Sequence, residues 1–337
     1  MKKIGKILSV CVVLFMLAAN PVFSFDLKLG DLQEGIKDFS EGIASSLPFY
    51  STMGLNWSDA YIGQLFGLPP RFGVGASIGF VTMGSGMFND LLGLFIDDFE
   101  MPNLNIGLPL PAYAFEARIG GIILPFDIGI KYGAFDTSKL GWEELLSGFG
   151  LDYMMFGVDF RYPLLDFKLM RFSVGLGYNL VKGGVSTKLG TGFSFDFENG
   201  SDKYLLSMSD LGLGIELQTN VLELKAQVSF PLFIVTPYAG MGVGIGWSKA
   251  GYYADSKFTF KKNGVDQNLE DLEKVLFDLF EIDTVTNEGF GYMANNTKMN
   301  MRFFGGISVN LFLFKLDVTL MYNFINFGAT IGLRFQL

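Results

Sequence analysis

Apolar side chains stand at every second position in three consecutive segments near the C-terminus of this chain. The segments run from Phe303 to Leu311, from Leu316 to Tyr322 and from Phe327 to Leu337. A period of two is typical of β-strands that have one apolar and one polar face. The connections between these segments are so short that only antiparallel hairpins can form. The C-terminal stretch therefore predicts an antiparallel sheet.

The direction in which the apolar face points decides the class of protein. If that face pointed inward, the exposed surface would consist mostly of Gly, Ser, Thr and Asn with few charges, which is unusual for a soluble protein. If it points outward, the surrounding medium is lipid. The second interpretation predicts a secretion signal, many long strands and an interior lined by small and polar residues. Each of these features can be looked for in the rest of the sequence.

The N-terminus has the three parts of a secretory signal peptide. Basic residues lie between Met1 and Lys6, an apolar run extends from Ile7 to Ala19, and small residues lead to Ser24. We expect residues 1–24 to form the signal peptide, with cleavage after Ser24.

Beyond residue 24, no apolar run approaches the roughly 18 residues that a membrane-spanning helix requires. Hydrophobic residues nevertheless make up 50% of the chain. Because a closed barrel also satisfies every backbone hydrogen bond in lipid, strands are the expected way to cross the membrane.

The alternation with a period of two recurs along the chain, which predicts an all-β fold. Regular segments are Arg71 to Val81, Ala112 to Gly120, Leu124 to Ala134, Met154 to Tyr162, Met170 to Leu180, Leu211 to Leu217, Leu222 to Phe230 and Tyr238 to Trp247; less regular ones are Phe49 to Trp57, Val185 to Phe197 and Lys257 to Lys261. A turn is expected near Thr219 and Asn220. We expect residues 48–337 to form a transmembrane antiparallel up-and-down β-barrel of about 12 strands, in a range of about 10–14.

Amphipathic helical patterns interrupt the alternation at the N-terminus and in a loop. Residues 25–47 carry apolar side chains at spacings of three and four, as do the residues from Asp266 to Ile282. For residues 25–47 two interpretations remain: a helix packed on a surface, or a plug inserted into the barrel. The connection from Gly84 to Pro111 is also apolar, and a loop of this length is uncommon without a structure or function of its own.

Glycines occupy one entire face of the segment from Tyr238 to Trp247. They stand at positions 240, 242, 244 and 246. Because glycine weakens a strand, this face predicts close backbone approach, sharp curvature or an object filling the adjacent space.

Charges of both signs occupy the polar face of the expected barrel and nearly cancel. Interleaved opposite charges in a narrow barrel pair with one another, whereas an ion-selective pore would carry a ring of one sign. We interpret these charges as pairs that stabilise the interior. The candidate lumen-lining residues are Glu116, Arg118, Asp127, Lys131, Asp159, Arg161, Arg171, Glu216, Glu223, Lys225, Arg302, Asp317 and Arg334.

Residue types that most enzymes use are missing. The chain has no histidine, and its single cysteine, Cys11, lies in the expected signal peptide. This excludes a Ser-His-Asp triad, thiolate chemistry in the mature protein and histidine-based metal sites. We therefore expect no enzyme activity, no cofactor and no metal. The net charge of −9 also argues against nucleic-acid binding, which requires a basic surface.

Nearly all of the mature sequence resembles bacterial outer-membrane β-barrel proteins. The alternating apolar residues from Phe327 to Phe335 match the C-terminal strand of that class, although the class typically ends in an aromatic residue and this chain ends in Leu337. The resemblance implies an outer-membrane location, with the lipid bilayer and the outer-membrane assembly machinery as partners.

The chain is also similar in outline to the long-chain fatty-acid channel family. The similarity lies in an amphipathic N-terminal segment, apolar helical loops and a lumen of mixed charge. It implies a barrel plugged by its N-terminus, with outer loops that capture apolar ligands.

We expect passive uptake of small hydrophobic molecules through a plugged channel. The alternatives are a structural or host-contact surface barrel protein and a general diffusion porin. The apolar loops motivate the uptake hypothesis. The candidate ligand-capture residues are Phe88, Leu91, Leu92, Phe95, Leu272, Leu276, Leu279 and Phe280.

Overall fold

A computed structural model describes residues 29–66, 70–83, 108–137, 149–188, 193–199, 202–267, 285–286 and 289–337. Within these ranges, helix α2 (Leu29–Ser51) precedes a single antiparallel sheet of thirteen strands. The strands are β1 (Phe72–Met83), β2 (Leu108–Gly120), β3 (Asp127–Asp136), β4 (Phe149–Asp166), β5 (Arg171–Lys188), β6 (Phe193–Asn199), β7 (Asp202–Ser229), β8 (Val235–Lys262), β9 (Val265–Asp266), β10 (Val285–Thr286), β11 (Gly289–Leu311), β12 (Phe314–Tyr322) and β13 (Phe327–Gln336). No helix in the described ranges is both long and apolar enough to span a membrane.

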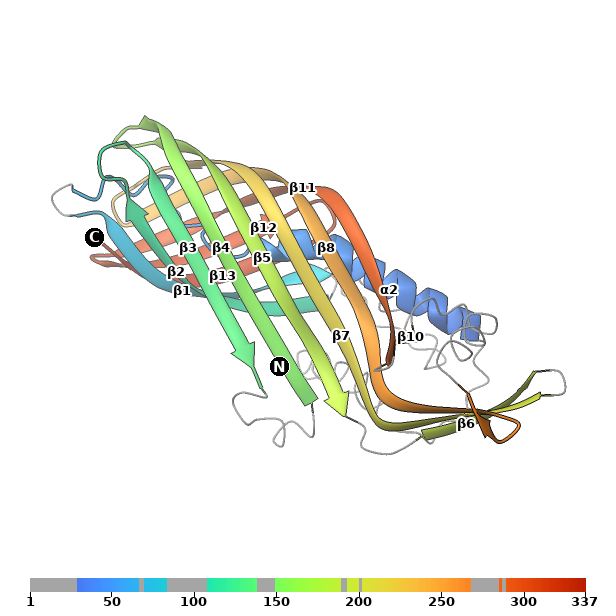
Figure 1. Cartoon of the computed structure of the whole chain (residues 1–337). Coiled ribbons are helices and arrows are strands. Elements are labelled where there is room, and N and C mark those ends of the chain that lie inside the picture. Colours follow the sequence, from blue (N-terminus) through green and yellow to red (C-terminus); the bar gives the residue numbers. More distant parts are fainter. Residues whose placement is uncertain are drawn as a thin grey trace, which may run out of the picture.

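Ten of the described strands close into a barrel (Figure 1). The order around the wall is β11, β12, β13, β1, β2, β3, β4, β5, β7 and β8, and the wall closes because β8 also pairs with β11. The short strands β6, β9 and β10 pair with the ends of β7, β8 and β11 and do not belong to the closed wall. The first and last strands, β1 and β13, are neighbours, as the pair Val74 and Phe335 illustrates.

The two rims of the barrel differ. The connections from β2 to β3, β4 to β5, β7 to β8 and β11 to β12 span at most a few residues and lie at one end, the short-turn rim. The connections from β1 to β2, β3 to β4, β5 to β7 and β8 to β11 are longer and lie at the opposite end, the long-loop rim, together with the four-residue turn from β12 to β13. Bacterial outer-membrane barrels have this asymmetry, with short turns toward the periplasm.

Apolar side chains cover the outside of the barrel and charged side chains fill its inside. Ile78, Phe115 and Leu224 are each about two-thirds exposed, at 65%, 64% and 66%. Arg118 and Arg161, in contrast, are among the largest fully buried side chains. This is the reverse of a soluble protein, and only a lipid surrounding makes such an outer face stable. The predicted all-β, antiparallel, lipid-facing barrel is therefore confirmed.

The expected number of about 12 strands is too high, because several segments do not form separate wall strands. In the stretch from Phe49 to Trp57, α2 ends at Ser51 and the following residues have no regular structure. The stretch from Val185 to Phe197 is divided between the end of β5 and β6, which lies outside the wall. The residues from Lys257 to Lys261 only extend β8.

A single strand, β7, replaces the two strands that were expected on either side of Thr219 and Asn220. Before this point the apolar residues have odd numbers, and after it they have even numbers. The strand continues without a turn, so the change of phase means that the outer face turns from polar to apolar. It marks the edge of the lipid belt. Leu217 consequently points inward, where it packs against a buried apolar cluster.

The expected loop helices are not confirmed. Residues 268–284, which make up most of the amphipathic stretch from Asp266 to Ile282, lie outside the described residues, as do residues 84–107 and the expected signal peptide.

A charge on the outer face of β7 should test where the lipid belt ends. We expect Leu224→Arg to lower the free energy of unfolding of the vesicle-inserted protein by about 2–4 kcal/mol, because it places a cation among acyl chains. Glu216→Arg, an exposed position on the same strand beyond the change of phase, should cost only about 0–1 kcal/mol. Equal costs for the two variants in a urea titration of vesicle-inserted protein would contradict this position of the belt.

Candidate functional site

The N-terminal part of the chain fills the barrel. Helix α2 contacts the strands β1, β5, β7, β8 and β11, and Figure 1 shows it entering from the long-loop rim. Every residue from 46 to 62 is buried. At the short-turn rim the backbone nitrogen of Leu65 donates to the carbonyl of Gly121 over 2.9 Å. Residues 46–62, hereafter the lumenal segment, therefore run through the barrel from one rim toward the other.

Glycines of the wall make room for this segment at two positions, Gly246 of β8 and Gly73 of β1. A Cβ atom at Gly246 would lie 2.5 Å from Cγ of Pro48, the proline in the last turn of α2. On the opposite side of the lumen, a Cβ at Gly73 would lie 2.8 Å from the ring of Trp57. Such distances are far shorter than a carbon contact. Of the expectations for the glycine face of β8, an object filling the adjacent space is correct at Gly246, whereas Gly244 lies close to the backbone of Leu222 and Gly240 and Gly242 lie against side chains of the wall.

Two cations and one amide of the wall donate hydrogen bonds to backbone carbonyls of the lumenal segment. Lys131 donates to the carbonyl of Ser51 over 2.7 Å and to that of Met53. Arg161 donates to the carbonyl of Asp59 over 2.7 Å, and the side-chain amide of Gln227 donates to that of Trp57 over 2.6 Å. Because residues 52–62 have no regular structure, their buried carbonyls need partners from elsewhere. The wall supplies these partners.

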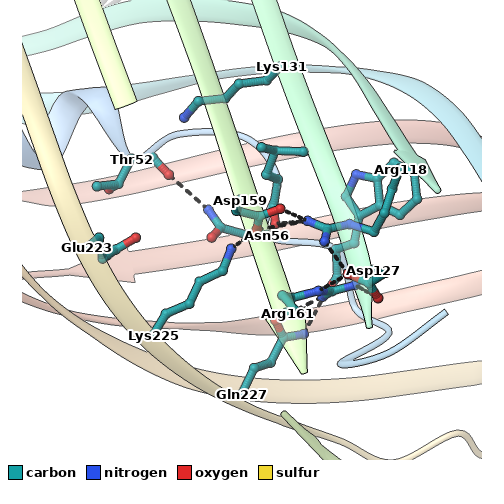
Figure 2. Close-up of polar contacts among 12 residues, drawn as sticks. Thr52, Asn56, Arg118, Asp127, Lys131, Asp159, Arg161, Glu223, Lys225 and Gln227 are labelled. Atoms are coloured by element: carbon teal, nitrogen blue, oxygen red, sulfur yellow. Dashed lines mark hydrogen bonds and ion pairs between the residues drawn. The ribbon is translucent and has the colours of Figure 1, made fainter. Parts of the chain in front are cut away.

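A buried ion-pair network joins β2, β3, β4 and β7 inside the barrel (Figure 2). Arg118 donates to Asp127 over 2.5 Å and to Asp159 over 2.7 Å. Arg161 contacts Asp127 over 2.8 Å, and Lys225 pairs with Asp159. Asp127 also accepts a hydrogen bond from the backbone nitrogen of Ile62 over 3.1 Å. The network therefore holds both the wall and the lumenal segment.

A second group of contacts fixes Asn56 and Trp57. Arg302 donates to Glu223 over 2.6 Å and 3.0 Å and to the side-chain oxygen of Asn56 over 3.1 Å. The indole nitrogen of Trp57 donates to Glu116 over 2.5 Å. Polar side chains of the segment thus use the remaining hydrogen-bonding capacity of the wall charges.

A third group surrounds Asp59 near the short-turn rim. Its carboxylate lies 2.6 Å from Lys315, 2.9 Å from Arg334 and 3.7 Å from Arg171. Arg334 also pairs with Asp317 over 2.7 Å. Asp59 belongs to the lumenal segment, whereas its partners belong to the wall.

Two cavities adjoin the lumenal segment. A cavity of about 20 Å³ lies beside Trp57, Glu116 and Arg334. A larger one of about 230 Å³ lies at the long-loop rim between α2, β11 and the turn from β12 to β13. Within the described ranges, no three acidic, histidine or cysteine side chains gather as metal ligands.

Most charges assigned to the lumen from the sequence lie inside the barrel. Arg171 is partly exposed at the short-turn rim, and Glu216 is exposed on the outer face of β7. The assignment of Glu216 to the lumen is wrong, because it assumed a turn at Thr219 that does not exist. The buried members are Glu116, Arg118, Asp127, Lys131, Asp159, Arg161, Glu223, Lys225, Arg302, Asp317 and Arg334. The candidate ligand-capture residues between 88 and 95 and between 272 and 280 lie outside the described residues.

The sequence analysis missed the residues of the lumenal segment. Asn56 lies in the stretch from Phe49 to Trp57, which was interpreted as a strand, and Asp59 lies beyond it where no pattern marks it. Lys315 could have been found, because it lies two positions before Asp317 and therefore on the same face of its strand.

No protein-family model and no curated protein matches this sequence. Similar solved structures include the outer membrane protease OmpT from Escherichia coli, with a TM-score of 0.42 and 9% identity over 83% of this chain and 100% of that chain. The attachment invasion locus protein Ail of Yersinia pestis has a TM-score of 0.26 and 10% identity over 79% and 95%. The monoaromatic hydrocarbon channel CymD has a TM-score of 0.27 and 11% identity over 93% and 99%.

The comparisons agree with the geometry on the class of fold alone. The ten-stranded wall, its apolar outer face and its charged interior are those of an outer-membrane β-barrel. The similar structures include a protease as well as a channel, so the barrel fold decides neither for nor against an enzyme. Their low similarity carries no argument about function.

Neutralising Asp127 should destabilise the whole barrel. Asp127→Asn leaves Arg118 and Arg161 buried without their shared carboxylate, and breaking a buried pair in this way costs about 3–5 kcal/mol. Asp166→Asn is the matched control, because Asp166 pairs with Arg171 on an exposed part of the surface and such pairs contribute about 0–1 kcal/mol. Urea unfolding followed by circular dichroism measures both variants. A loss below about 1 kcal/mol for Asp127→Asn would show that the network does not stabilise the fold.

Proposed function

We propose that this protein is an outer-membrane channel for small apolar molecules, closed in its resting state by the lumenal segment. The observation that carries the proposal is the cavity of about 230 Å³ that adjoins α2 at the long-loop rim. It supports a route in which an apolar molecule first binds next to the plug and then passes when the plug moves.

The cavity lies where the wall of the barrel changes height. The strands β7 and β8 have 28 residues each and β11 has 23, whereas β12 and β13 have 9 and 10. β12 ends at Tyr322, which pairs with Phe303. Before Phe303, β11 continues for many residues with β8 on one side. On its other side, among the described residues, only the short strand β10 pairs with it, near Phe290.

The lining of this cavity is suited to apolar ligands. Met299, Phe324 and Ile325 are 70%, 62% and 67% exposed, and Met301 and Pro48 complete the apolar part. Methionine side chains adapt to ligands of different shape. Pockets for drug-sized molecules measure about 300–1,000 Å³, so a cavity of about 230 Å³ favours a smaller molecule. The polar members of the lining are Ser45, Lys298, Asn300, Asn323 and Asn326.

Contact between the cavity and the plug supports coupling between ligand binding and opening. Pro48 lines the cavity and also contacts the glycine face of β8. A ligand in the cavity would therefore contact Pro48, the residue through which α2 packs against Gly246 of β8. Short turns of bacterial outer-membrane barrels face the periplasm, so the cavity would lie on the cell-surface side.

A surface-recognition function is the second candidate. β7 and β8 continue past the edge of the lipid belt and carry β6 and β9, and Figure 1 shows this extension bending away from the barrel. A barrel that only transports would not need such a projection. A general diffusion porin is less well supported, because the lumenal segment occupies the interior.

Loosening the lumenal segment should open the channel. Lys131→Met removes two charge-assisted hydrogen bonds to the carbonyls of Ser51 and Met53, each contributing about 1.5–3 kcal/mol. We expect rare openings for the wild type in planar lipid bilayers and a more than roughly tenfold higher open probability for the variant. The matched control is Lys168→Met, an exposed lysine in the turn from β4 to β5. Large, steady conductance of the wild type would favour a general porin instead.

Filling the cavity should slow uptake of apolar molecules. We expect Met301→Trp to lower the rate at which 1-naphthylamine enters cells carrying the barrel by about tenfold, the effect of roughly 1.4 kcal/mol. Met293→Trp, on the same strand but away from the cavity, should change the rate less than about twofold. Uptake is followed by naphthylamine fluorescence and normalised to the amount of folded barrel. Equal rates in both variants and in cells without the barrel would exclude this uptake function and leave surface recognition.

A further inference from the structure

Three cations from three different strands converge on one carboxylate of the lumenal segment. Lys315 of β12 lies 2.6 Å from Asp59, Arg334 of β13 lies 2.9 Å from it, and Arg171 of β5 lies 3.7 Å from it. Arg334 also donates to the hydroxyl of Ser58 over 2.7 Å. The side chain of Asp59 is only 4% exposed.

These cations stand at one mouth of the barrel. Arg171 begins β5, Lys315 is the second residue of β12 and Arg334 is close to the end of β13. All three positions lie at the short-turn rim. The side chains of Arg171 and Lys315 are 30% and 15% exposed, so water reaches the cationic group from outside while Arg334 forms its buried floor.

Three acids, Asp59, Asp166 and Asp317, pair with these three cations, and one buried donor of the group is still unused. Among the described residues, Asp59 is the acid that lies within 4 Å of Lys315. Nε of Arg334 is buried and has no hydrogen-bond partner in the described part of the chain. Arg171 has a second partner, Asp166, only on the exposed surface. The group therefore binds the anionic side chain of Asp59 and keeps a buried donor, Nε of Arg334, unused.

Asp59 contributes its carboxylate to this group from a part of the chain without regular structure. It belongs to residues 52–62, which have no regular structure and are held by side chains of the wall. Its backbone carbonyl accepts from Arg161, so the segment keeps a nearby anchor when the carboxylate leaves. Arginine and lysine together recognise a planar carboxylate by charge-assisted hydrogen bonds.

We propose that Arg171, Lys315 and Arg334 form a binding site for small carboxylates at the short-turn mouth of the lumen, and that the protein's own Asp59 occupies it in the closed state. A carboxylate entering from the water at this mouth competes with Asp59 and releases that part of the lumenal segment. This site does not rest on uptake of apolar molecules, because it lies at the opposite rim from the apolar cavity.

Replacing the internal carboxylate with a free one tests the proposal. Asp59→Ala removes a group equivalent to formate, so the probe is sodium formate, with sodium chloride at equal ionic strength as reference. We expect Asp59→Ala in detergent to unfold at a lower temperature than the wild type in chloride, and formate to restore at least half of the loss, because a ligand that binds only the folded state stabilises it. The wild type should respond equally to both salts.

Two further variants complete the experiment. Asp59→Asn is the matched control, because its side chain still fills the site, and formate should not stabilise it. Adding Arg334→Met to Asp59→Ala should abolish the response to formate. If Asp59→Ala does not fold, Asp59→Ala with Lys315→Met leaves two arginines around the vacancy and is measured in the same way. The proposal is overturned if formate raises the unfolding temperature of neither Asp59→Ala nor Asp59→Ala with Lys315→Met above its value in chloride. It is also overturned if formate raises the unfolding temperature of Asp59→Asn or of the wild type by as much as that of Asp59→Ala.

Discussion

A charged side chain inside this barrel needs contact with an opposite charge or a backbone carbonyl. Burying a charge without such a partner destabilises the fold by on the order of several kcal/mol. Arg118 and Arg161 meet this requirement partly through carboxylates of the wall, and Lys131 meets it through carbonyls of residues 51 and 53. The wall and the lumenal segment therefore form one polar unit. Neither has its hydrogen bonds satisfied without the other.

The same segment meets two different chemistries at its two ends. At the long-loop rim, Pro48 borders a cavity whose lining is half apolar, with Met299, Met301, Phe324 and Ile325 as the other apolar members. At the short-turn rim, Asp59 lies among three cations. A molecule that binds at either end would contact the same stretch of chain. The proposed channel and the proposed carboxylate site both depend on this shared stretch of chain.

The sequence predicted correctly which side chains point inward where the alternation is regular. It failed where the phase of the alternation changes within one strand. Glu223 and Lys225 were correctly expected to point inward because they alternate with apolar neighbours. Glu216 was assigned to the same face because the change of phase near Thr219 was interpreted as a turn. In the folded protein the strand continues, and the phase changes because the medium outside the barrel changes from lipid to water. Asp59 gave no signal, since a segment without regular structure has no period.

The amino-acid sequence by itself determined that this chain forms an antiparallel barrel with an apolar outer face and a lumen of mixed charge, because alternation is a property of neighbouring residues and records the medium on each side of a strand. Tertiary structure alone decided how many strands close the wall and which charges pair. Arg118 meets Asp159 from two strands away, and Lys315 meets Asp59 across 256 positions of the chain. Such pairs depend on the register of every intervening strand and on the path of a segment through the lumen. Neither can be derived from a local stretch of the sequence.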